Sequence, residues 1–162
     1  MVTEGRKILV TSRGGNREVI KTILEVLRSN LHTCKDIVVN LRGLDVYSQC
    51  YSIFDFVCCN VHYIEDAGNN QYVKTPARTL EDGFADCKSM AILVYCCCYA
   101  LDIPCELRFV DFRGAGIYSH VYVVATDRTS GEEIIIDPVE RVNGQPAFNY
   151  CSQFVKKISY TI

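Results

Sequence analysis

The chain has 162 residues, of which 49% are hydrophobic and 22% charged, and its formal net charge at pH 7 is −2. This length and composition exclude a disordered chain and favour one hydrophobic core, so we expect a single domain over residues 1–162. The small negative charge predicts no nucleic-acid partner, because phosphate binding requires a basic surface. The longest apolar run, residues 90–101, is shorter than the roughly 20 residues that span a bilayer, so we expect no membrane association.

The N-terminal residues predict a cytoplasmic protein. Residues 8–10 are apolar but too few for the core of a signal peptide.

The strand that we expect over residues 8–11 leads into a turn at 13–16, with Asn16 as the N-cap of a helix over 17–30. Apolar side chains recur at helical spacing in this helix, at Val19, Ile20, Ile23, Leu24 and Leu27. The apolar pattern of residues 45–65 predicts a second helix, and residues 66–83 are expected to form a long loop.

Residues 86–101 give the clearest helical pattern. Apolar residues occupy nearly every position, which predicts a helix buried on most sides. After it the period changes, and we expect strands over 105–112, 120–126, 133–137 and 155–162, with turns at 113–116 and 127–131. The short connections favour an antiparallel sheet. Helices followed by strands indicate an α+β fold, with the N-terminal helices packed on the sheet.

The ten cysteines allow two interpretations, a disulfide framework or reduced thiols in the core. Three of them are consecutive, at positions 96–98, within the apolar helix. Adjacent cysteines fit a structural disulfide pattern poorly, and dense disulfides are typical of small secreted proteins. No two cysteines have the C-x₂-C spacing of structural zinc sites. We therefore expect reduced thiols and no bound metal.

One cysteine has a position that favours catalysis. Cys87 begins the apolar helix, directly after a possible N-cap, Asp86. Free N–H groups and the helix dipole favour a thiolate at a helix N-terminus, and the same N–H groups can stabilise an oxyanion. A buried cysteine that happens to begin a helix is the alternative.

Two later residues complete a possible catalytic set. His120 begins an expected strand after a glycine-containing loop, and Asp137 ends the next strand before Pro138. Two antiparallel strands joined by the turn at 127–131 would place them side by side. For each residue considered by itself there is a simpler alternative: an ordinary core or surface histidine for His120, and an ordinary turn residue for Asp137. The order of Cys87, His120 and Asp137 predicts a nucleophile, a base and an orienting group.

Residues 72–138 resemble the transglutaminase-like superfamily, the papain-like fold that includes microbial and phage-borne cysteine enzymes. The matching segments are residues 75–83, Asp-Cys-Lys-Ser at 86–89, Leu-Asp-Ile-Pro at 101–104, Ser-His-Val-Tyr-Val at 119–123 and Ile-Asp-Pro at 136–138. In that family a small residue and Asp-Cys open a helix, Gly-Ile-Pro ends it, and a histidine on a strand and an aspartate before proline follow. The resemblance assigns the catalytic roles to Cys87, His120 and Asp137 and implies no cofactor.

The sequence departs from the family at two positions. Asp102 and Ala85 stand where glycine is usual, and both changes can reshape the cleft without touching the proposed triad. The family's oxyanion partner is not identifiable by motif, although Gln71 and Tyr72 are candidates, each with an ordinary loop residue as the alternative.

The expected function is acyl transfer on amide or peptide bonds through a thioester, with a protein or peptide as substrate and hydrolysis favoured over cross-linking. Transglutaminase cross-linking of the same intermediate is one alternative. Others are a non-catalytic phage, assembly or binding module that retains the fold, and a redox or metal protein built on the many thiols. Oligomeric state and substrate identity stay open.

Overall fold

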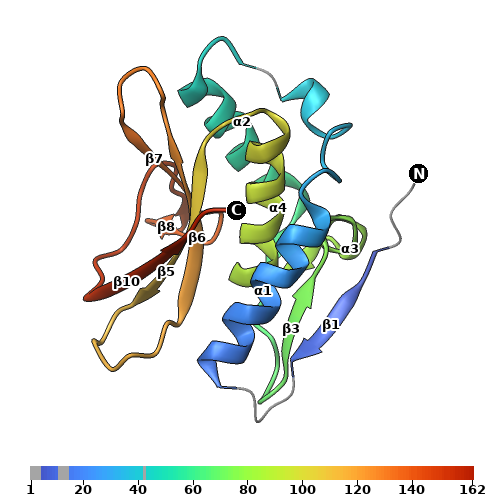
Figure 1. The fold of residues 1–162 in the computed structure, drawn as a ribbon, viewed down its shortest axis with the longest axis vertical. Coiled ribbons are helices and arrows are strands. Elements are labelled where there is room, and N and C mark those ends of the chain that lie inside the picture. The colour runs from blue at the N-terminus through green and yellow to red at the C-terminus, as the bar shows by residue number, and fades with distance from the viewer. Residues whose placement is uncertain (1–4, 11–14, 42) are drawn as a thin grey trace.

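The computed structural model describes residues 5–10, 15–41 and 43–162. Its largest sheet has four antiparallel strands in the order β10-β5-β6-β7. The helices pack on one side of this sheet, with α4 against β5 and β6, α2 against β7, and α1 further out (Figure 1). A small antiparallel pair, β1 and β3, lies beyond α1 on the far side from the sheet. The expected α+β fold with an antiparallel sheet is confirmed.

The helices are α1 (Asn16–Asn30), α2 (Val46–Asn60), α3 (Pro76–Asp82) and α4 (Cys87–Ala100), with a short 3₁₀ turn at Val38–Asn40. The main sheet contains β5 (Cys105–Asp111), β6 (His120–Thr126), β7 (Glu133–Ile136) and β10 (Lys156–Tyr160). Shorter pairs join β1 (Lys7–Val10) to β3 (Gln71–Lys74), β2 (His62–Tyr63) to β4 (Phe84–Ala85) and β8 (Arg141–Val142) to β9 (Gln145–Pro146). The expected helices at 17–30 and 86–101 and the four main strands are confirmed to within a few residues at their ends.

The buried helix α4 organises the core. Every residue from 88 to 98 is buried, and the helix contacts β6 on one side and α1, α2 and α3 on the others. The sequence 96–98 therefore fills the core with small sulfur side chains, and all ten cysteines are unpaired. None of the helices in the described residues is long and apolar enough to cross a bilayer.

The expected helix over 45–65 is too long. α2 ends at Asn60 because the backbone of Val61 is extended, with φ −132° and ψ 117°. His62 and Tyr63 then pair with β4 in a parallel arrangement, so tertiary pairing takes over the last residues of the apolar pattern.

The loop expected over 66–83 is also wrong, because it contains β3 and α3. Thr75 caps α3 by accepting a hydrogen bond from the Arg78 N–H, and Pro76 occupies the first helical turn. Gly83 ends the helix with a left-handed φ of 68°, which a glycine adopts without strain. These are local start and stop signals, but they enclose only seven residues.

The expected N-cap at Asn16 is wrong as well. Gly15 is the N-cap of α1 and makes no side-chain cap. The Asn16 amide instead bonds the backbone of Tyr118, more than a hundred residues along the chain. Thr11 of the expected first strand and residues 13 and 14 of the expected turn lie outside the described residues.

Candidate active site

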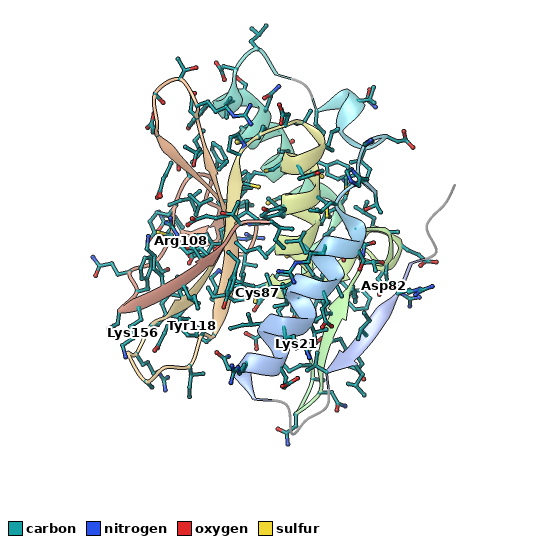
Figure 2. All side chains as sticks on the ribbon, viewed as in Figure 1. Lys21, Asp82, Cys87, Arg108, Tyr118 and Lys156 are labelled. Carbon is teal, nitrogen blue, oxygen red and sulfur yellow. The ribbon has the colours of Figure 1, made fainter. Side chains whose placement is uncertain are left out.

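Cys87 is the first residue of α4 and lies between α1 and the first residues of β6 (Figure 2). The helix begins there because Asp86 is extended and its carboxylate accepts a hydrogen bond from the Ser89 N–H at 3.3 Å. This cap leaves the N–H groups of Cys87 and Lys88 without a partner in their own helix. As the first residue of the helix, Cys87 lies beside these donors. It is half-buried, so it remains accessible to solvent.

His120 begins β6 and lies opposite Val110 of β5. Its ring stacks on Phe112, with centroids 6.2 Å apart and planes at 20°, and packs against Tyr122 with centroids 5.7 Å apart. The side chain is 11% exposed. These aromatic contacts orient the plane of the imidazole and leave its two nitrogens free to form hydrogen bonds.

Asp137 follows β7 and is almost completely buried. Its Oδ2 lies 2.5 Å from His120 Nε2, and its Oδ1 accepts a hydrogen bond from the Val139 N–H at 3.1 Å. The antiparallel register of β6 and β7 produces this pairing, as the hairpin argument predicted. Because the backbone holds one carboxylate oxygen, the other is fixed on the histidine.

The charge of His120 follows from these contacts. Burial lowers the pKa of His120, but hydrogen bonds with Asp137 and Cys87 outweigh it and raise the pKa from 6.5 to about 10. The imidazolium is therefore favoured at neutral pH. Since Asp137 engages Nε2, Nδ1 is the nitrogen left for the Cys87 thiol, so the structure brings all three candidate residues together.

A cavity of about 360 Å³ opens at Cys87 and His120. Its volume falls at the small end of the roughly 300–1,000 Å³ typical of ligand sites. Its walls come from α1, the start of α4, β5 and the segment that leads into β6. Gln71, one of the two oxyanion candidates, lines this cavity. Tyr72 does not, because it borders a separate cavity with its ring under the Lys7 ammonium.

Sequence reasoning missed Lys88. Its side chain is 8% exposed, and its ammonium group contacts the carboxylates of Asp86 and Asp66 and donates to Gln71 Oε1 at 2.8 Å. Burial lowers the pKa of Lys88, and the charge of Asp66 opposes this effect. A lysine beside a cysteine gave no signal in the sequence, because two of its three partners, Asp66 and Gln71, approach it only in the fold.

Glu140 was also missed. In the described part of the chain, one group of possible metal ligands has its donor atoms within 4.8 Å of one another, namely His120, Asp137 and Glu140. Two of these three residues already form the hydrogen-bonded pair. An ion held there would have to replace the proton between His120 and Asp137.

Solved structures of three proteins resemble the chain. A candidate cysteine protease from Cytophaga hutchinsonii has 21% identity and a TM-score of 0.53, and the match covers 96% of this chain and 60% of that one. Calcium-bound LapG from Legionella pneumophila has 18% identity and a TM-score of 0.54, over 92% of this chain and 77% of that one. A candidate protease from Parabacteroides distasonis has 15% identity and a TM-score of 0.54, over 75% and 26%.

These similarities show that the chain has the papain-like fold of cysteine proteases, which agrees with the resemblance inferred from the sequence. The chain spans about three fifths of the length of the Cytophaga protein. No protein-family model matches the sequence. No curated protein is significantly similar to it.

Proposed function

We propose that the chain is a cysteine peptidase or amidase in which Cys87, His120 and Asp137 are the nucleophile, the acid–base residue and the orienting residue. The observation that carries the proposal is the hydrogen bond between His120 and Asp137 on the wall of a cavity that Cys87 also lines, at the N-terminus of α4. The papain-like fold supports the same class of chemistry.

In the first half of the reaction the thiolate of Cys87 attacks the carbonyl carbon of an amide. A C–S bond forms, and the negative charge that develops on the oxygen faces the free N–H groups of α4. Protonated His120 gives its proton to the leaving nitrogen as the C–N bond breaks. The products of this half are a thioester on Cys87 and a free amine.

In the second half a water molecule attacks the thioester. Neutral His120 takes a proton from the water, the C–S bond breaks, and the acid leaves while the thiolate and imidazolium are restored. An amine in place of water would give cross-linking by the same steps. Asp137 keeps Nε2 occupied throughout, so the ring presents Nδ1 to the sulfur and the substrate.

Incubation with a proteome-derived peptide mixture, read by mass spectrometry, tests the proposal. We expect new peptide termini with the native protein, and a loss of at least about 1,000-fold with Cys87→Ser. Cys59→Ser is the matched control, since Cys59 is an exposed cysteine outside the cavity, and it should keep full activity. Cleavage that survives in Cys87→Ser would overturn the assignment.

Alkylation gives a second readout that needs no substrate. Iodoacetamide at neutral pH should modify Cys87 faster than the exposed Cys59 in the same sample, and His120→Ala should remove the difference. Equal rates for the two thiols in the native protein would show that Cys87 is not activated.

A further inference from the structure

The β5–β6 loop, residues 112–119, is held by the carboxylate at its start (Figure 1). Asp111, the last residue of β5, is 1% exposed. Its Oδ1 accepts hydrogen bonds from the N–H groups of Arg113 and Gly114, both at 2.9 Å, and its Oδ2 accepts one from the Gly116 N–H at 2.6 Å. A buried carboxylate needs such donors to replace its lost hydration. One side chain therefore fixes the first half of the loop.

The second half of the loop has other partners. Asn16 Oδ1 accepts a hydrogen bond from the Tyr118 N–H at 2.9 Å, and the Ser119 N–H donates to the Val110 carbonyl at 3.1 Å. Gly116, between the two groups of bonds, has a φ of 79°, a left-handed value that other residues adopt only with strain. The conformation of the loop is therefore set by contacts within the protein.

This conformation brings an aromatic ring to the reacting histidine. Phe112, the first residue of the loop, stacks on the His120 ring with the two planes at 20°, although Phe112 is 37% exposed. A ring that is exposed to this extent has few core contacts to hold it, so its position depends on its backbone. That backbone is enclosed by the hydrogen bond between the Asp111 carboxylate and the Arg113 N–H, the turn that an aspartate forms with the residue two positions later.

We propose that Asp111 is a positioning residue for the reaction at Cys87. Its carboxylate holds the loop in the conformation that keeps the Phe112 ring on His120, and this contact holds the imidazole at the angle from which it exchanges protons with the sulfur and the substrate. The inference rests on the proposed function, because Asp111 affects the reaction only through His120. A displacement of about 1 Å at a reacting group can lower the rate about 100-fold, so an indirect contact of this kind can control it.

Asp111→Asn replaces one acceptor oxygen by an NH₂ group, which cannot accept from the loop N–H groups. We expect the nuclear Overhauser effect between the Phe112 and His120 rings to weaken and kcat on a cleaved peptide to fall about 10-fold or more. KM should change by less than about threefold, because the cavity end of the loop keeps its own partners.

Asp45→Asn is the matched control for this change. Asp45 also accepts a hydrogen bond from a backbone N–H, that of Ser48, and it does not line the cavity. The control should leave kcat and the ring contact unchanged. A native kcat in Asp111→Asn would overturn the proposal.

Two glycine substitutions test the loop without touching the carboxylate. Gly116→Ala and Gly131→Ala each add a methyl group that meets nothing within 4 Å, at φ values of 79° and 74°. Both therefore introduce similar backbone strain, one in the β5–β6 loop and one in the turn that follows the other end of β6. We expect Gly116→Ala to lower kcat about fivefold and to weaken the ring contact, and Gly131→Ala to do neither. Equal kcat values for the two variants would contradict the proposal, even if Asp111→Asn does not fold.

Two further results separate this inference from the proposed function. If peptides are cleaved, Phe112→Leu, which removes the planar ring, should lower kcat, while Phe112→Tyr, which keeps the ring, should stay within about threefold of the native value. Equal kcat values for these two variants would overturn the positioning role alone. If no peptide is cleaved, the ring contact in Asp111→Asn and Gly116→Ala still decides whether the carboxylate positions Phe112 on His120, and an unchanged contact in both variants would overturn the inference.

Discussion

At the scale of single residues, His120 concentrates the chemistry of the site. Its ring hydrogen-bonds the buried carboxylate of Asp137, packs against two aromatic rings and lines the same cavity as Cys87. Phe112 and Asp137 directly follow β5 and β7, Tyr122 lies on β6 itself and Cys87 begins α4, so the ring is contacted from four parts of the fold. The roles of Cys87, His120 and Asp137 in catalysis stay predictions, and their proximity is a property of the structure.

The raised pKa of His120 predicts how stability changes with pH. The pKa in the folded protein is about 10 and the ordinary value is 6.5, so the stabilising contribution is fully present below pH 6.5 and is lost as the pH rises through 10. Urea unfolding between pH 6 and 10 should show this decline in the free energy of unfolding. Asp137→Asn should make the decline smaller, because it lowers the pKa of His120 in the folded protein.

Nitrogen NMR of the imidazole checks the same point directly. At pH 8 the ring should be protonated in the native protein and largely neutral in Asp137→Asn. A neutral His120 in the native protein at pH 8 would rule out the charge state on which the first proton transfer depends.

At the scale of the elements, the hairpin of β6 and β7 and the N-terminus of α4 set the site. The hairpin brings His120 and Asp137 together by register, and the Asp86 cap places Cys87 in the first turn of α4. α1 contributes through its first residue, Asn16, whose side chain bonds the backbone of Tyr118 just before β6. The site therefore depends on elements from both ends of the described chain.

Asn16→Ala should loosen this connection without unfolding α1. Two hydrogen bonds are lost, each contributing about 1 kcal/mol, so the Tyr118 amide should exchange with solvent roughly 30-fold faster. Amide exchange followed by NMR measures the effect. Asn30→Ala is the matched control, because the Asn30 side chain bonds only within its own helix, to Val26, and Tyr118 should be unaffected. Unchanged exchange at Tyr118 in Asn16→Ala would show that this contact does not order the segment.

At the scale of the whole molecule, Lys88 joins segments that are far apart in the sequence. Its ammonium group contacts Asp66, Gln71 and Asp86, and so connects the segment before β3, β3 itself and the cap of α4. A buried lysine is stable there because two carboxylates compensate its charge.

Lys88→Met keeps the length of the side chain and removes its charge. Two partly or fully buried carboxylates then lack a cation, and the free energy of unfolding should fall by about 3–5 kcal/mol. Lys157→Met on β10 is the control, because Lys157 is exposed and its change should stay within about 0.5 kcal/mol. Urea denaturation compares the two variants, and equal losses would argue against a structural role for the buried cluster.

Much of the fold could be predicted from the sequence because its strongest patterns are local. The α4 segment is apolar on every side, and a helix with that pattern must be central. The change of period after residue 104 indicates strands, and short turns make them antiparallel. The helix over 45–65 was too long because β2 depends on pairing with β4 elsewhere in the chain. The loop over 66–83 was wrong because the local signals of α3 enclose only seven residues, too few to show a helical pattern.

By itself, the sequence determined the α+β class, the central helix and the order of Cys87, His120 and Asp137, because periodicity, capping residues and motif order are local properties. Only the tertiary structure decided that Asn16 bonds Tyr118 and does not cap its helix, that Lys88 is buried between two carboxylates, and that α1 supplies an apolar wall beside the thiol. Apart from the Lys88–Asp86 contact, the hydrogen bonds of Lys88 and Asn16 join residues from 17 to 102 positions apart. Side-chain partners at such separations follow from how the elements pack, and no local pattern encodes them.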